Sequence, residues 1–276
     1  MGAKKKRALV PPPLKSLKRA RQITSAFHAA EHGRTVDGPP PDRAAYQDAS
    51  QTATARHRTT SRFVFSSLTA LGVRRAAGCP RPAVLEIGAV NTQLLACPWL
   101  AVRAIDIRPS ARGIEACDFF SLGPPQPGGG GGTTFDVVVC AMVLNCVATP
   151  ARRGDMLVRM RACLTAPGGV AIVALPRRCV ERGGGGVGGA RPHPPAASSS
   201  PSDEACAARW APFEAAMAAA GLAPVLARKA SPKIAFWAVG VGQRAAGGWG
   251  KNGMMMGSDF GVVVPPVETK GGGTCK

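Results

Sequence analysis

The chain has 276 residues, of which 45% are hydrophobic, and this is enough apolar material for one α/β domain with tails. Its formal net charge of +19 indicates a polyanionic partner, most commonly nucleic acid, and carries little information about the fold. No run of eighteen apolar residues occurs, so no membrane span is expected. The nine cysteines form no Cys-x-x-Cys pair, so no metal site is expected either.

Residues 1–43 are predicted to be a basic, largely disordered arm. Basic clusters at 4–7 and 14–21 flank a proline run at 11–13, and residues 14–32 are compatible with a helix that ends before Gly33. Two basic clusters separated by a short spacer are typical of a nuclear import signal or a nucleic-acid-binding arm. A merely solvated basic tail is the alternative.

Residues 44–72 contain few helix breakers and end in an amphipathic stretch. We expect a helix here that packs on a sheet and begins the folded domain, residues 44–241. Its basic residues would lie near the strand ends and contact RNA phosphates or a cofactor carboxylate, unless they form only a solvated face. These residues are Arg56, His57, Arg58 and Arg62.

The most informative stretch begins with an apolar run, 83–87, typical of a buried parallel strand. Gly88 follows where the chain must turn sharply and allow a ligand to approach the backbone. A second strand, 101–107, contains Asp106, an acid in the position where α/β nucleotide sites hold ribose hydroxyls. An ordinary strand, turn and strand with a chance acid is the alternative.

The turn lacks the Gly-x-Gly-x-x-Gly pattern of a dinucleotide site, because Gly88 is followed by Ala-Val-Asn-Thr. A ligand with a ribose and no phosphate therefore fits better, and S-adenosylmethionine is such a ligand. After a third short strand, Asp118 and Phe119 provide a carboxylate for the amine of an adenine and an aromatic ring to wall it.

The remaining elements alternate between strands and helices. We expect a central strand within 135–147, a helix at 151–165, a strand at 170–175, a helix at 203–220 and a closing hairpin of 222–227 with 234–241. The helix at 203–220 places Trp210, Phe213 and Met217 on one face. Insertions at about 123–133 and 181–202 and a glycine-rich tail, 242–276, are predicted to be disordered.

This order predicts an α/β fold with a mainly parallel sheet and a C-terminal antiparallel hairpin. It is the Rossmann-like arrangement of the class I S-adenosylmethionine methyltransferases.

Several segments occur in one order that resembles a known family. They are YQDAS (46–50), HRTTSR (57–62), AVLEIGAVN, VRAIDIRP, EACDFF, FDVVVCAMVLNCV, ARRGDMLVRMRACL and VALPRRCV. Together, over about residues 44–180, they resemble the 25S ribosomal RNA adenine-N1 methyltransferases and their animal relatives, which act as S-adenosylmethionine sensors. The most specific piece is Val143-Leu144-Asn145, followed by Cys146 where the family usually has phenylalanine.

The resemblance implies roles for individual residues. Gly88 matches the cofactor-binding glycine and Asp106 the ribose-binding acid, while Asp118 and Phe119 match adenine-side contacts. Two further positions follow the fourth strand: Ala141 matches a small residue beside the cofactor, and Asn145 matches an asparagine near the methyl-transfer position.

Asn145 is our candidate for orienting the amine of the target adenine, and a hydrogen bond to its own loop is the alternative. Trp99, Phe119 and Trp210 are candidate stacking residues, with core packing as the alternative for each. Cys140 and Cys146 are expected in the core.

The sequence departs from the family after Cys179, where a polar segment is replaced by Glu181, Arg182 and four glycines. Two hypotheses follow. The first is a nuclear or nucleolar enzyme that uses S-adenosylmethionine to methylate N1 of an adenine in 25S ribosomal RNA, alone or within a pre-ribosome. The second is a sensor that binds the cofactor and a protein partner without catalysis. The basic N-terminus and the net charge favour the first.

Overall fold

A seven-stranded sheet organises the larger of two units into which the chain divides, residues 1–59 and 60–276. The computed structural model describes residues 16–31, 38–39, 41–42, 44–46, 48–49, 59–76, 78–123, 134–181, 203–243, 254–255 and 260–266. The predicted insertions lie almost entirely outside these ranges, as do Arg56, His57 and Arg58.

The first unit contains the helix expected at 14–32. Helix α1 spans Leu17–Glu31, and the hydroxyl of Ser16 accepts a hydrogen bond from the Arg19 N–H at 3.3 Å at its start. The ring of Phe27 stacks on Tyr46, with centroids 4.3 Å apart. This contact joins α1 to the short helical turn at 44–46.

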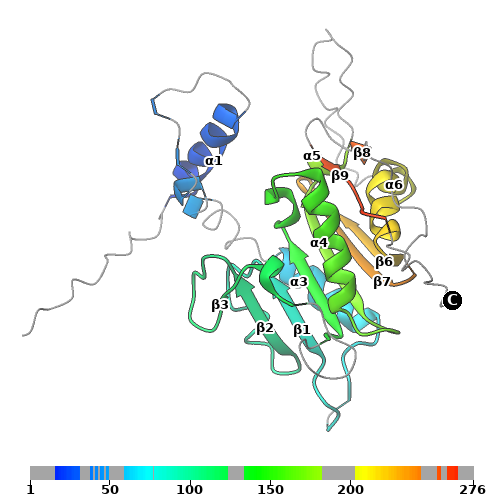
Figure 1. The fold of residues 1–276 in the computed structure, drawn as a ribbon. Coiled ribbons are helices and arrows are strands. Elements are labelled where there is room, and N and C mark those ends of the chain that lie inside the picture. The colour runs from blue at the N-terminus through cyan, green and yellow to red at the C-terminus, as the bar shows by residue number, and fades with distance from the viewer. Residues whose placement is uncertain are drawn as a thin grey trace, which may run out of the picture. The chain divides into compact units, whose positions relative to one another are not determined.

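The sheet of the second unit has the strand order β3-β2-β1-β4-β5-β7-β6 (Figure 1). Strands β1 to β5 pair in parallel, and β7 pairs antiparallel with β5 and β6. Their bounds are β1 Ala83–Ile87, β2 Ala101–Asp106, β3 Glu115–Ala116, β4 Val137–Ala141, β5 Val170–Pro176, β6 Leu222–Ala230 and β7 Ile234–Val241. The predicted α/β class, with its parallel sheet and antiparallel C-terminal hairpin, is confirmed.

Helices cover both faces of this sheet, which is why its central strands are apolar throughout. Helix α3, Thr59–Ala70, packs Phe63 and Leu68 against the face that carries Val137 and Val139. Helices α4, Pro150–Cys163, and α6, Asp203–Ala219, cover the opposite face (Figure 1). The alternation of side chains along β4 thus supplies both cores.

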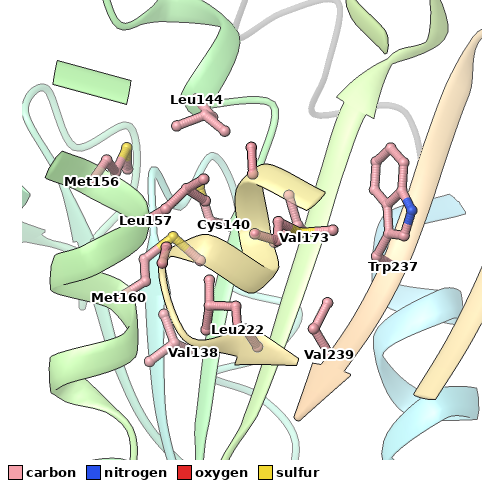
Figure 2. Close-up of a cluster of buried hydrophobic side chains, with 14 of the residues drawn as sticks. Val138, Cys140, Leu144, Met156, Leu157, Met160, Val173, Leu222, Trp237 and Val239 are labelled. Carbon is pink, nitrogen blue, oxygen red and sulfur yellow. The ribbon is translucent and has the colours of Figure 1, made fainter. Parts of the chain in front are cut away.

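Figure 2 shows the α4 side of the core. Met156, Leu157 and Met160 from α4 lie over Val138 and Cys140 of β4, and Trp237 of β7 extends the same apolar layer. The predicted apolar face of α6 is confirmed: Trp210, Phe213 and Met217 are all fully buried. Gly221, with φ 84°, ends that helix in the left-handed region, as expected of a capping glycine.

The strand expected within 135–147 is shorter than its apolar composition indicates. Strand β4 ends at Ala141 because Met142 adopts a left-handed backbone, φ 62°, and the 3₁₀ turn η2, Leu144–Cys146, follows. Strand β2 ends at Asp106 rather than 107, where the Asp106 carboxylate accepts the Arg108 N–H at 2.6 Å and starts a turn.

The prediction of a wholly disordered tail after 242 is wrong for part of it. Strands β8, Met254–Met255, and β9, Gly261–Val262, pair antiparallel, and β9 lies beside α4 and α6 (Figure 1). Phe260, Val262 and Val264 are buried in the main core. These apolar residues pack against parts of the core that are distant in sequence, so no local pattern predicts their burial.

Two shorter elements complete the second unit: η1, Phe119–Ser121, and α5, Arg177–Val180. None of the helices in the described residues is long and apolar enough to cross a bilayer.

Candidate cofactor and methyl-acceptor site

The candidate site lies at the carboxyl ends of β1, β2 and β4. Ile87 pairs with Ile105 on one side and Cys140 on the other, so the residues that follow these strands meet at one edge of the sheet. The chain order reverses at β1, since β2 and β3 lie on one side of it and β4 and β5 on the other. Open α/β sheets bind ligands in the crevice at such a switch point.

Gly88 makes the turn at the end of β1 with φ 73°. Its N–H and that of Ala89 both donate to the Ile105 carbonyl oxygen, at 2.8 and 3.0 Å, which fixes the turn against β2. A methyl group added at Gly88 would overlap Val143 and lie 3.9 Å from an Asp106 carboxylate oxygen. The glycine is therefore required by its backbone and by the close approach of Val143, and it lies beside Asp106.

Asp106 presents a carboxylate to this edge. Its Oδ1 accepts the Arg108 N–H, while its Oδ2 is the oxygen nearest Gly88. Partial burial raises the pKa of Asp106, and the Arg108 hydrogen bond opposes that shift. A half-buried carboxylate with one oxygen directed toward the glycine turn is suited to accept hydrogen bonds from two hydroxyls.

Asp118 reaches the same edge through β3, because Ala116 pairs with Asp106. Its Oδ1 accepts the Phe120 N–H at 2.9 Å and caps η1, so part of its carboxylate has a structural task. Phe119 is 5% exposed and belongs to the core, where it meets the Phe120 ring at 6.2 Å. The packing role given as the alternative is observed for Phe119, and its adenine contact stays a prediction.

Ile107 was not singled out from the sequence. It directly follows Asp106 and is 60% exposed, and Leu226, at 41%, is the other exposed large hydrophobic residue among the described residues. An apolar side chain beside a hydroxyl-binding acid is suited to wall a flat base. The sequence feature that could have indicated this role is its position directly after Asp106, the acid that ends β2.

Glu86 was also missed, although it interrupts the apolar run of β1. Its Oε2 is buried and has no hydrogen-bond partner among the described residues. Burial raises the pKa of Glu86 to about 8. A buried carboxyl two residues before Gly88 selects for a ligand that brings a positive charge or a donor.

The loop after β4 completes the edge. Met142 donates its N–H to the Ala174 carbonyl oxygen at 2.9 Å, and fully buried Leu144 anchors the turn. A left-handed methionine is strained, and such strain is concentrated at functional sites. Ala141 is half-buried at the end of β4, beside this turn.

Asn145 projects from this turn with its amide only weakly satisfied. Its Nδ2 contacts the Cys146 sulfur at 3.4 Å, and its buried Oδ1 has no partner among the described residues. A buried acceptor without a donor is rare and indicates an absent partner. The alternative role for Asn145 was a hydrogen bond to its own loop. Among the described residues, the contact with the Cys146 thiol is the only side-chain bond of this kind. Cys146, expected in the core, is exposed, and its thiol donates to the Met142 carbonyl oxygen at 3.5 Å.

Other predicted residues divide between core and surface. Trp210 is buried against Trp237 at 5.0 Å, so it serves the core, and Trp99 packs half-buried against Phe65 at 6.2 Å. Arg62 is exposed at the start of α3. The hydroxyl of the neighbouring Ser61 donates a hydrogen bond to Oε1 of Gln93 at 2.5 Å. That bond places the start of α3 beside the loop after Gly88.

The residues at this edge fit S-adenosylmethionine. Asp106 and Ile107 suit a nucleoside, and the unpartnered Glu86 carboxyl suits a cationic ligand. No group of three or more potential metal ligands occurs within the described ranges. The sheet order, the antiparallel seventh strand and this edge define a class I S-adenosylmethionine-dependent methyltransferase.

Comparison with known families identifies the kind of methyltransferase. Residues 42–183 match the family described as 25S rRNA (adenine(2142)-N(1))-methyltransferase, Bmt2. The match covers more than half of the chain, and the chain belongs to this family. A comparison with curated proteins finds no match.

Several solved methyltransferase structures resemble the chain distantly. The N-methyltransferase NodS from Bradyrhizobium japonicum WM9, in complex with S-adenosyl-L-homocysteine, is 16% identical over 69% of this chain and 91% of its own, with a TM-score of 0.40. Human N-acetylserotonin methyltransferase, in complex with SAM, is 12% identical over 82% of this chain and 66% of its own, with a TM-score of 0.45.

Proposed function

We propose that this protein transfers a methyl group from S-adenosylmethionine to N1 of an adenine in large-subunit ribosomal RNA. Membership of the 25S rRNA adenine-N1 methyltransferase family gives the reaction and the substrate class. The structural observation that carries the proposal is the unsatisfied Asn145 oxygen, in the loop at the same edge as Gly88 and Asp106.

The chain's own residues bind and orient the two reactants. Asp106 accepts hydrogen bonds from the ribose hydroxyls, Ile107 walls the adenine ring, and Asp118 accepts from its amine. A positive charge on the ligand would favour the ionised form of the Glu86 carboxyl and pair with it. When bound, the cofactor supplies an electrophilic methyl group on sulfur, so the protein's contribution is mainly positioning.

The acceptor must arrive unpaired. The N1 edge of adenine is blocked in duplex RNA, so the base has to be in a loop or flipped out of its helix. Asn145 accepts a hydrogen bond from the amine beside N1 and thereby orients the nitrogen that receives the methyl group. The left-handed backbone at Met142 ends β4 and begins the turn that carries Asn145.

The test is transfer of labelled methyl groups to large-subunit ribosomal RNA, with binding of the cofactor measured in parallel. Asn145→Ala should abolish transfer to adenine and leave cofactor binding intact, whereas Asp106→Ala should reduce both. Cofactor binding by the unmodified protein without label in any RNA would refute the enzyme and support a cofactor sensor instead.

We further infer that the protein works in the nucleolus, on pre-ribosomal RNA during ribosome biogenesis. The basic clusters at 4–7 and 14–21 and the net charge of +19 support this location and this polyanionic partner. Fluorescence imaging of the full chain, with residues 4–7 intact or changed to alanine, tests it. An unchanged distribution of the fluorescence would show that residues 4–7 are not the localisation signal.

A further inference from the structure

A buried arginine connects the candidate site to a distant part of the chain. Arg153 lies in the first turn of α4 and is 7% exposed. Its guanidinium donates to three carbonyl oxygens: Nε to Val147 at 2.9 Å, Nη2 to Ala148 at 3.4 Å and Nη1 to Gly261 at 2.9 Å. No carboxylate pairs with it among the described residues. Burial lowers the pKa of Arg153.

A cation buried without a carboxylate partner is unfavourable, and its position in the first turn also opposes the helix dipole. The arrangement therefore gives little stability that an apolar residue would not give. What the guanidinium provides is geometry, since one planar group fixes carbonyls from two separate segments.

The first segment is the end of the Asn145 loop. Val147 and Ala148 follow η2 directly, and the Val147 N–H donates back to the Leu144 carbonyl oxygen at 3.3 Å. Arg153 thus holds the carbonyls two and three residues beyond Asn145. Among the described residues, the Met142 N–H to Ala174 bond is the one backbone hydrogen bond that joins this loop to a strand.

The second segment is 260–264, which we call the C-terminal strap. The ring of Phe260 lies 4.5 Å from the Arg153 guanidinium carbon and 6.4 Å from the ring of Phe213 in α6. The Val263 N–H donates to the Pro150 carbonyl oxygen at 2.9 Å. Phe260 thus contacts both α4, through Arg153, and α6, through Phe213.

Gly154 shows how closely the strap and α4 approach. A methyl group at this position would overlap the Val263 carbonyl oxygen and reach 3.0 Å from the Val264 Cα. Glycine inside a helix is unfavourable, so a helix of this kind ordinarily gains stability when alanine replaces it. Here the missing side chain makes room for backbone from more than 100 residues away.

We propose that the C-terminal strap, acting through Arg153, positions the Asn145 loop for the methyl acceptor. Arg153 is a positioning residue, because it touches the loop carbonyls and the strap rather than either reactant. The proposal rests on the function assigned above to Asn145. It predicts that the strap governs transfer and leaves binding at Gly88 and Asp106 unaffected.

The experiment uses the full chain and compares Gly154→Ala, Arg153→Met and Arg153→Lys with deletion of residues 267–276 as the control. In the first two, kcat should fall by about 100-fold, as for a small misplacement of a reacting group, with the cofactor Kd within about twofold. Arg153→Lys keeps the charge but not the planar fork, so its loss should be smaller than that of Arg153→Met. The control should match the unmodified chain.

Hydrogen exchange separates this proposal from the function on which it rests. Amides at 142–149 should exchange faster in Gly154→Ala and Arg153→Met, while those of β1 stay protected. This readout needs no RNA and no turnover, so it decides the coupling even if the unmodified chain transfers no label. Unchanged exchange at 142–149, or a thermal midpoint raised by Gly154→Ala with full activity, would overturn the proposal.

Discussion

The two halves of the candidate site are built differently. The half around Gly88 and Asp106 is held by regular strand pairing and by two backbone hydrogen bonds to Ile105. The half around Asn145 is an irregular loop, strained at Met142 and held through Arg153. The first half is rigid by local construction, whereas the second depends on residues far away in the chain. We infer that cofactor binding and methyl transfer will respond separately to mutation.

The largest expected effect is on the rigid half. Asp106→Ala removes a carboxylate whose hydrogen bonds to ligand hydroxyls are worth about 1.5–3 kcal/mol each, so cofactor affinity should fall by about 100-fold or more. Titration calorimetry measures it. The comparison fails if Asp106→Ala retains affinity while Asn145→Ala loses it.

Gly88→Ala should be the next most damaging change. Alanine would have to adopt φ 73° and would overlap Val143, so both the free energy of unfolding and cofactor binding should drop. The backbone strain alone is about 1–2 kcal/mol. Thermal unfolding of Gly88→Ala and of the double variant Gly88→Ala/Val143→Ala separates the loss of stability caused by backbone strain from that caused by overlap with Val143. Partial recovery in the double variant is expected, and none would place the whole effect in the backbone.

Glu86→Gln should have opposite effects on stability and on binding. The carboxyl has a pKa of about 8 when folded and about 4.5 when unfolded, so between these values the unfolded chain binds fewer protons. The free energy of unfolding should therefore decrease as pH rises through this window, by at most about 1.4 kcal/mol per pH unit.

Glutamine cannot ionise, so Glu86→Gln should flatten this dependence and raise the stability of the ligand-free protein above pH 8. Cofactor affinity should fall, because the variant cannot pair with a cation. Thermal unfolding from pH 5 to 9, with and without cofactor, checks both. An equal slope in the two proteins would contradict the burial of this carboxyl.

The smallest effect is expected in the half around Asn145. Cys146→Ser replaces a weak sulfur contact to the Asn145 amide with a hydroxyl of similar size on an exposed turn. A neutral hydrogen bond contributes about 1 kcal/mol, so kcat should change by about fivefold or less, with the cofactor Kd unchanged. Steady-state kinetics on RNA measures the change. A larger shift in Kd than in kcat would show that the two halves are not separable.

The same division decides what could be predicted from the sequence. Strands β1 and β2, Gly88 and Asp106 follow one another within 24 residues, and local periodicity with one glycine and one acid predicts them. The apolar face of α6 was predictable for the same reason. All these features depend on neighbours in sequence.

The rest depended on contacts that no local pattern contains. The strand at 135–147 was overextended because its apolar composition continues past Met142, where the backbone turns left-handed. Phe260, Val262 and Val264 were assigned to a mobile tail because glycines and short islands surround them. Glu86 was not predicted as a site residue, because a carboxyl in a strand indicates a ligand contact only when it is known to be buried without a hydrogen-bond partner.

The strap also sets an order of events during synthesis. Gly261 is made 108 residues after the arginine that it contacts. At about 5–20 residues per second, this interval is about 5–20 s. A nascent chain can therefore form β1, β2 and β4 and their glycine turn well before the Asn145 loop is held in place. Synthesis of the strap, rather than formation of the sheet, would then mark the moment at which the Asn145 loop is held in place.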